Sequence, residues 1–365
     1  MKSKDRLKKA QKEAESTIKK TNEKIVELGA HAKELNSSLN EIQIRINLIR
    51  NVPTEQRIKF QEAQEIILNW NQQVEEIEKN YTNSFSVASG VGAAGAGAGV
   101  AVVAMGPSAA MGIATTFGVA STGTAISSLS GAAATSAALA WLGGGTVAMG
   151  AGGMAAGKAL LALAGPIGWS IAAVSIVSSG ISLWFKIQDK HRLEEIYTLV
   201  NERETKSYSL AIVEMNERMV RMDTDIEILN ESIEIIRTFG RDYSDMTERQ
   251  QYELGALVNQ VAASTQLLVN PIQGLQPKYT EEDYKFFISV MHSEEDPKSF
   301  EKCEPIILSL ANLLYQIPID ENDKKLLGKS LKSNKKFLKS YGIKKRDFDV
   351  KYIDLAKQAL SFKYE

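Results

Sequence analysis

The sequence predicts an all-α protein: long antiparallel coiled-coil helices flank a Gly/Ala-rich hydrophobic helical region, and a small helical domain follows. Three observations support this prediction. Apolar residues repeat every 3.5 positions on both sides of the centre, 106 central residues carry one charge, and shorter helical patterns follow. We therefore divide the 365 residues into N-terminal helices (1–79), a hydrophobic membrane-insertion region (80–185), returning helices (186–270) and a C-terminal domain (271–365).

The N-terminal segment is predicted to begin with one helix over residues 1–50. Its apolar seam alternates spacings of three and four, which keeps one face toward a partner helix. Pro53 ends this helix, because proline cannot donate a backbone hydrogen bond, and a second helix follows. A short turn between two helices favours an antiparallel pair. The seam positions are Ile18, Thr21, Ile25, Leu28, Ala32, Leu35, Leu39, Ile42, Ile46 and Ile49, and those of the second helix are Ala63, Ile67, Trp70, Val74 and Ile77.

The central region contains 20 of the 26 glycines, and Lys158 is its single charge. Glycine weakens a helix in water, whereas in lipid small residues four apart let helices approach closely. Between Lys158 and Lys186 lie 27 uncharged residues, and about 20 are enough to span a bilayer. We therefore expect contact with a lipid bilayer. The positions expected to pack helices, bend them or mark the membrane interface are Gly95, Gly99, Gly153, Gly157, Pro166, Trp169 and Trp184.

Other interpretations of this region stay open. Its upstream segments are weakly hydrophobic, because alanine and glycine contribute little apolar area. They would hide against one another in a soluble state and enter a bilayer when something exposes them. A buried soluble core, a flexible linker, and a β-tongue over residues 115–128 are the alternatives.

The returning segment is predicted to form a helix from about Lys186 to Gly240 and another from Thr247 to Val269. We expect the two flanking helical segments to pack on each other, which brings both ends of the hydrophobic region to the same end of a stalk. The seam of the first returning helix is Met215, Met219, Met222, Ile226, Leu229, Ile233 and Ile236, and that of the second is Leu254, Leu257, Val261 and Leu268.

The C-terminal domain is predicted to open with a capping box formed by Thr280 and Asp283. Residues 322–351 then carry eleven basic and three acidic side chains, with Phe337, Tyr341, Phe348 and Tyr352 interleaved. Lysines attract phosphates and aromatic rings stack on bases, so we expect a nucleotide or short single-stranded DNA to bind here. Anionic lipid headgroups and a merely solvated basic helix are the alternatives. The candidate ligand-binding residues are Lys324, Lys325, Lys332, Lys335, Lys336, Lys339, Tyr341, Lys344, Lys345 and Arg346.

Little in the sequence indicates catalysis, a cofactor or a metal centre. The three histidines lie on separate predicted helices, and Lys158 precedes Ala159 where a phosphate-binding loop needs Ser or Thr. Cys303 is alone, which excludes a disulfide framework. A net charge of −1 excludes a globally basic nucleic-acid binder. We therefore expect a non-enzymatic protein without cofactor or metal.

The segments GAAGAGAGVAVV and GGGTVAMGAGGMAAGKALLALAGPIGW, with the flanking heptads, resemble the membrane-channel effectors of Hailong anti-phage defence systems. The resemblance implies a homo-oligomeric, tetrameric ion channel in the bacterial inner membrane. It would stay closed until a nucleotidyltransferase encoded nearby makes an oligodeoxyadenylate signal, and then depolarise the infected cell. No individual ligand-binding residue of that family can be matched onto this chain.

The same order of segments is similar to helical pore-forming toxins of the cytolysin A type, which fold long helices around a hidden apolar hairpin. Export is not indicated, because the basic start MKSKDRLKKAQKEAEST lacks the apolar stretch of a signal peptide. We therefore expect synthesis in the cytoplasm. A soluble coiled-coil scaffold is the third class of protein that the sequence allows.

Overall fold

The computed structural model describes residues 3–88, 106–117, 187–291, 303–333, 338 and 343–365. Eleven candidate positions lie outside these residues and receive no structural account. They are Gly95, Gly99, Gly153, Gly157, Pro166, Trp169 and Trp184 of the hydrophobic region, and Lys335, Lys336, Lys339 and Tyr341 of the C-terminal domain.

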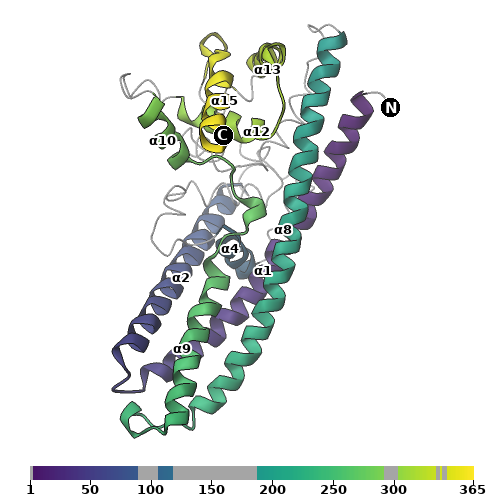
Figure 1. The fold of residues 1–365 in the computed structure, drawn as a ribbon. Coiled ribbons are helices and arrows are strands. Elements are labelled where there is room, and N and C mark those ends of the chain that lie inside the picture. The colour runs from purple at the N-terminus through teal and green to yellow at the C-terminus, as the bar shows by residue number, and fades with distance from the viewer. Residues whose placement is uncertain (1–2, 89–105, 118–186, 292–302, 334–337, 339–342) are drawn as a thin grey trace.

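The described residues form helices and no strand, which confirms the predicted all-α class (Figure 1). Their bounds are α1 Ser3–Asn47, α2 Thr54–Ala88, α4 Gly106–Phe117, α8 Ile187–Ile236, α9 Glu248–Val269, α10 Glu281–Met291, α12 Glu304–Leu314, α13 Glu321–Ser333 and α15 Lys351–Tyr364. Three short 3₁₀ turns join them: η2 Tyr243–Asp245, η3 Gln273–Leu275 and η4 Lys345–Asp347.

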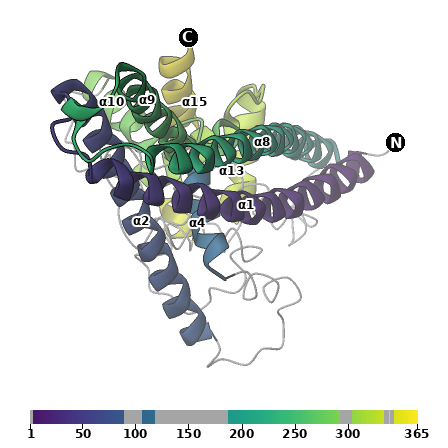
Figure 2. The same ribbon diagram turned by 90° about the horizontal axis from the view of Figure 1, so that it is seen from below.

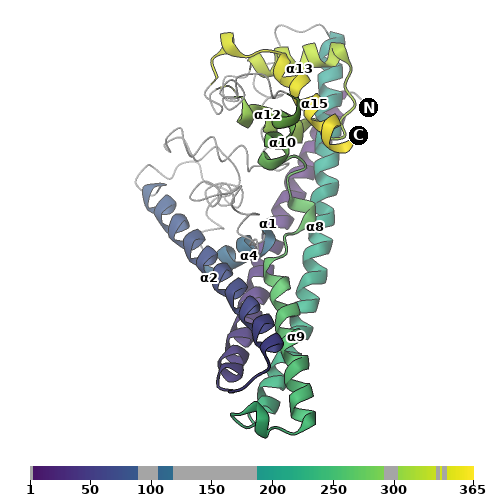
Figure 3. The ribbon, with the colours of Figure 1, turned by 60° about the vertical axis from the view of Figure 1, so that its left-hand side comes forward.

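The long helices α1, α2, α8 and α9 pack with α4 around one hydrophobic core. We call these helices together the stalk. The predicted seams supply it: Leu28, Leu35 and Leu39 of α1 are fully buried, as are Met215 and Met222 of α8. Apolar residues that recur every three or four positions line one face of a helix, so burying that face removes a continuous stripe from water. Alpha-4 packs among α1, α2 and α9 at mid-height of the stalk (Figures 1 and 3).

The pairing of the long helices differs in part from the prediction. Successive helices reverse direction and the two flanking segments pack on each other, both as expected, but α1 packs most closely on α8 and α2 on α9 rather than α1 on α2. Figure 2 shows α1 and α8 side by side. The α1–α8 pair runs parallel, since His31 contacts Asp223 and Ser38 contacts Asn230 at a constant offset in sequence. Heptad periodicity fixes which face is buried, whereas the choice of partner depends on contacts distant in sequence.

Both helix reversals meet at the tip of the stalk, at the bottom of Figure 1. The backbone of Arg50 donates to Arg241 O over 2.8 Å and accepts from Tyr243 N over 2.9 Å. Asn51 adopts a left-handed conformation with φ of 58° and donates to the carboxylate of Asp242 over 2.8 Å. Asparagine tolerates that backbone conformation better than most residues. The two turns therefore form one joint.

The C-terminal domain packs α10, α12, α13 and α15 around a second core. That core includes Leu7 of α1 and Ile196, Tyr197 and Val200 of α8, so the outer ends of both helices carry the domain. The predicted capping box is confirmed, because Thr280 N donates to Asp283 Oδ2 over 2.7 Å and Asp283 N donates back to Thr280 Oγ1 over 3.2 Å.

Among the helices that the structure describes, none combines the length and the hydropathy that crossing a bilayer requires.

Candidate functional site

The basic side chains of the C-terminal domain divide into exposed ones and internally bonded ones. Alpha-13 passes beside the segment around η4, since Lys332 Nζ donates to Phe348 O over 3.1 Å. Gly328 of α13 allows this approach, because a Cβ there would lie 2.8 Å from Val350 Cγ2. Five exposed cations come from these two adjacent elements, and we call them the basic edge: Lys325, Lys329, Lys344, Lys345 and Arg346.

Two candidate lysines are occupied by contacts within the domain. Lys324 Nζ lies 2.6 Å from Glu321 Oε1 and 2.9 Å from Asp354 Oδ1, and both carboxylates raise its pKa. Lys332 Nζ donates to the backbone carbonyl of Phe348. The remaining described candidates, Lys325, Lys344, Lys345 and Arg346, belong to the basic edge and are exposed to solvent, and Arg346 Nε also lies 3.4 Å from Asp347 Oδ1.

The described aromatic rings beside the basic edge do not offer open stacking faces. Phe348 is buried in the domain core, and its ring meets Tyr352 edge-on at 5.8 Å between centroids. Burial is also the main reason that the pKa of Tyr352 rises to about 12. The described part of this surface is therefore suited to phosphate attraction more than to base stacking.

A second feature is the docked helix α4, which belongs to the hydrophobic region. Its Ala110, Ile113 and Ala114 are buried in the stalk core. Two glycines let α1 and α4 touch backbone to backbone: a Cβ on Gly29 would lie 1.8 Å from Ser108 O, and one on Gly112 would lie 1.9 Å from Ile25 O. A larger residue at either position would force the helices apart.

Two polar side chains of α4 are buried without a hydrogen-bond partner in the described part of the chain. Thr115 and Thr116 are buried, and their hydroxyls find no hydrogen-bond partner among the described residues. A buried unsatisfied hydroxyl costs about 1–3 kcal/mol. The two hydroxyls therefore make the packing of α4 in the stalk less stable than its apolar contacts alone would make it.

The carbonyl end of α4 is held by a latch built from α8 and the segment after α9. Ile272 N donates to Thr116 O over 2.8 Å. Arg218 of α8 donates to Asn270 O and, over 3.5 Å, to Thr115 O. One turn earlier, Glu214 accepts from Gln273 N over 2.9 Å. The last carbonyls of a helix lack partners within the helix, and the latch supplies them.

Arg218 sits in a poorly solvated position. Burial lowers its pKa from the usual value, and Glu214 at 3.9 Å opposes this effect. A buried guanidinium that satisfies backbone carbonyls binds them more strongly than a neutral donor would. Arg218 therefore holds the segment after α9 through Asn270 O and reaches α4 itself through the longer contact with Thr115 O, beside the 2.8 Å bond from Ile272 N to Thr116 O.

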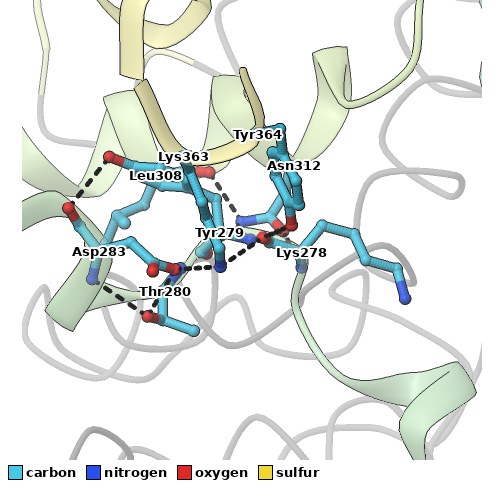
Figure 4. A network of polar contacts seen from close by, with 8 residues as sticks. All are labelled: Lys278, Tyr279, Thr280, Asp283, Leu308, Asn312, Lys363 and Tyr364. Atoms are coloured by element: carbon cyan, nitrogen blue, oxygen red, sulfur yellow. Dashed lines mark hydrogen bonds and ion pairs between the residues drawn. The ribbon is translucent and has the colours of Figure 1, made fainter. Parts of the chain in front are cut away.

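The same segment leads from the latch into the C-terminal domain, where its backbone is clamped (Figure 4). Asn312 Oδ1 accepts from Lys278 N over 2.8 Å and from Tyr279 N over 3.1 Å. Lys363 Nζ donates to Lys278 O over 3.0 Å and to Asp283 Oδ2 over 2.5 Å, and the Tyr364 hydroxyl donates to Lys278 O. The end of α15 therefore holds the backbone of residues 270–280, which we call the linker. The same linker contacts α4 through Ile272.

Buried charges join the linker and α12 to the stalk. Arg203 of α8 donates to Leu313 O over 3.0 Å and to the carboxylate of Glu204. Burial raises the pKa of Glu204, and the charges of Arg203 and Lys278 oppose this. Burial likewise lowers the pKa of Lys278. A carboxylate in this position costs free energy when ionised, which makes the junction sensitive to protonation.

A bidentate ion pair fastens α13 to the stalk. Arg192 Nε and Nη2 donate to the two oxygens of Asp323 over 2.8 and 2.7 Å. The hydrogen bond from Arg192 is the largest cause that lowers the pKa of Asp323. Alpha-13 carries two cations of the basic edge, so this pair ties that surface to α8.

Within the described residues, no group of three or more His, Cys, Asp or Glu side chains is arranged to hold a metal ion. His31 bonds to Asp223 over 2.6 Å, and His191 lies 3.4 Å from Glu194.

Comparison with known proteins found no matching family model, no matching curated protein and no matching solved structure.

Proposed function

We propose that this chain is a ligand-gated membrane pore or ion-channel effector that is held closed by its own stalk. The observation that carries the proposal is the docking of α4. It belongs to the hydrophobic region, yet it is buried between α1, α2 and α9, with two threonine hydroxyls that find no partner among the described residues. A stored apolar helix of this kind enters a bilayer when its dock opens.

The trigger in this proposal is an anionic ligand at the basic edge. The contacts of Arg192 with Asp323 and of Lys363 with Lys278 O connect that domain to α8 and to the latch. Binding can open the pore only by the difference in ligand affinity between the closed and open states. A short oligonucleotide carries several phosphates, which the five exposed cations of the basic edge would attract together.

The wider setting follows the resemblance to the Hailong effectors. The heptad seams pack the long helices of each chain together, the resemblance implies a homo-oligomer of four such chains, and the hydrophobic region forms the pore in the inner membrane. A nucleotidyltransferase encoded nearby would supply an oligodeoxyadenylate signal during phage infection. Opening the pore would then disrupt the membrane of the infected cell.

Dye release from liposomes tests this function. The full chain is added to phosphatidylethanolamine and phosphatidylglycerol vesicles that contain a self-quenched dye, with and without short oligodeoxyadenylates. We expect release only when both protein and oligonucleotide are present, and less release with mononucleotides, which carry fewer phosphates. Oligothymidylates of equal length carry the same phosphates, so a difference in dye release from oligodeoxyadenylates would show that the protein recognises the adenine bases.

Two other outcomes assign the chain to another class. Release by the protein alone favours a cytolysin A-type toxin that needs no ligand. No release with any oligonucleotide, together with no binding to vesicles, favours a soluble scaffold and overturns the proposal.

A further inference from the structure

The outer face of α8 carries a row of exposed apolar side chains. Five of them are between 40% and 65% exposed, although each is large and hydrophobic. With a rotation of about 100° per residue, all five fall within an arc of about 80°. They are Leu210, Val213, Val220, Ile228 and Ile235, and we call them the outer stripe.

The outer stripe points away from the stalk. On one side of it α8 contacts α1, through Asp223 with His31 and Asn230 with Ser38. On the other side α8 contacts α9, where Asp225 accepts from Gln260 over 3.0 Å. The face opposite the stripe is the buried methionine seam. Alpha-8 therefore has two apolar faces, and a helix with apolar residues on both sides is one that is covered on both sides.

We propose that a second copy of this chain covers the outer stripe, with its α8 packed antiparallel to the first. The charges on this face select the partner and the direction. Lys206 precedes the stripe's centre and Glu231 follows it, with Glu217 and Arg221 between them. All four are exposed, and within the described part of the chain none forms an ion pair.

An antiparallel arrangement matches these charges with each other. When the two-fold axis crosses the outer stripe at the height of residue 219 along α8, Leu210 of one copy lies opposite Ile228 of the other. The same register sets Glu217 opposite Arg221 and brings Lys206 close to Glu231. A parallel arrangement in register sets each of these charges against its own copy, which is repulsive.

The stripe is long enough for such a contact. From Leu210 to Ile235 the helix rises about 38 Å at about 1.5 Å per residue. This inference deepens the homo-oligomer of the proposed function, but it does not depend on membranes or on a trigger. Its test therefore reads assembly in solution, and failure of dye release leaves it standing.

Sedimentation velocity of the full chain over a concentration series measures the assembly. We expect the wild type to associate and Val220→Glu to weaken association at least tenfold, because it places carboxylates beside the two-fold axis. Leu68→Glu is the matched control, since Leu68 is 56% exposed on α2 and lies outside the stripe. Its association constant should equal that of the wild type.

Charge exchange tests the direction of packing. Lys206→Glu and Glu231→Lys should each weaken association about three- to tenfold, since symmetry repeats each pair twice. The double variant should restore it. A monomeric wild type, equal effects of Val220→Glu and Leu68→Glu, or a double variant weaker than either single one would each overturn the proposal.

Discussion

The backbone N–H of Ile272 donates to the carbonyl of Thr116 over 2.8 Å. This bond joins the end of the docked helix α4 to the segment that enters the C-terminal domain. The last turn of α4 therefore shares its fastening with the linker that Asn312 and Lys363 clamp. A displacement of that linker would therefore break the hydrogen bond between Ile272 N and Thr116 O at the end of α4.

Arg218→Gln should loosen α4. The variant lacks the cation that reaches Asn270 O and Thr115 O, and a hydrogen bond from a charged donor contributes about 1.5–3 kcal/mol. We expect faster hydrogen exchange in α4 and greater dye release at low trigger concentration. Arg249→Gln is the control, because Arg249 is 85% exposed and, among the described residues, pairs with Glu253 of its own helix. Unchanged exchange in α4 would show that Arg218 does not fasten it.

Gly29→Ala should push α4 out of its dock without altering the hydrophobic region itself. The added Cβ would lie 1.8 Å from Ser108 O, so α1 and α4 must separate, at a cost of about 1–3 kcal/mol. Thermal unfolding and hydrogen exchange in α4 measure the effect. Gly240→Ala is the matched control, because its Cβ meets nothing within 4 Å. If both variants exchange alike, the glycine contact is not what holds α4.

Acid should weaken the fastening of α13. Arg192 holds the pKa of Asp323 below 3.8, so the stabilisation is complete above that pH and disappears as pH falls through the lowered pKa. Asp323→Asn lacks this carboxylate at every pH. Urea unfolding should find the variant less stable at pH 7, with a difference that shrinks below pH 3.8. A difference that is the same on both sides of the lowered pKa would contradict the assignment.

Glu204→Gln should have the opposite pH dependence. Burial raises the pKa of Glu204 above 4.5, so the wild type loses stability as pH rises from 4.5 through the raised pKa. Glutamine does not titrate and keeps the shape of the side chain. The free energy of unfolding of the variant, relative to the wild type, should therefore increase with pH over that interval. A flat difference would mean that Glu204 does not titrate there.

Charge reversal on the basic edge should weaken oligonucleotide binding. Lys344→Glu with Lys345→Glu removes two exposed cations, and the slope of log K against log salt should fall by about one for each phosphate that is no longer neutralised. Fluorescence anisotropy with a labelled oligodeoxyadenylate measures both. Arg57→Glu with Lys59→Glu, at the far end of the stalk, makes the same change in net charge. Equal weakening by both pairs would place the ligand elsewhere.

Much of the fold could be predicted because its signals are local. Thr247 accepts from Gln250 N in a capping box where the second returning helix was predicted to begin, and the predicted heptad positions of α1 and α8 are largely buried. The parallel α1–α8 pairing could not be predicted in this way. The short turn between α1 and α2 sets the direction of the next helix but not its partner, which long-range packing selects.

The candidate site was predictable in part for the same reason. The cluster of lysines is visible in the sequence. The ion pair of Lys324 with Asp354 is not, because the two residues lie 30 positions apart on different helices. Arg218 and Glu214 were missed because their partners are backbone groups, which every residue carries. Gly29 had a usable signal: a lone glycine inside an Ile/Leu seam indicates a close approach of another backbone.

The joint at the tip binds the two hairpins where Arg50 pairs with Arg241 and Tyr243. Away from this joint α1 and α8 stay side by side as far as the C-terminal domain, whose core includes Leu7 and Tyr197, whereas α2 diverges from them (Figure 3). Alpha-4 packs against both the α1–α8 side and α2. An outward swing of α2 about the joint would uncover α4 and leave the α1–α8 pair intact.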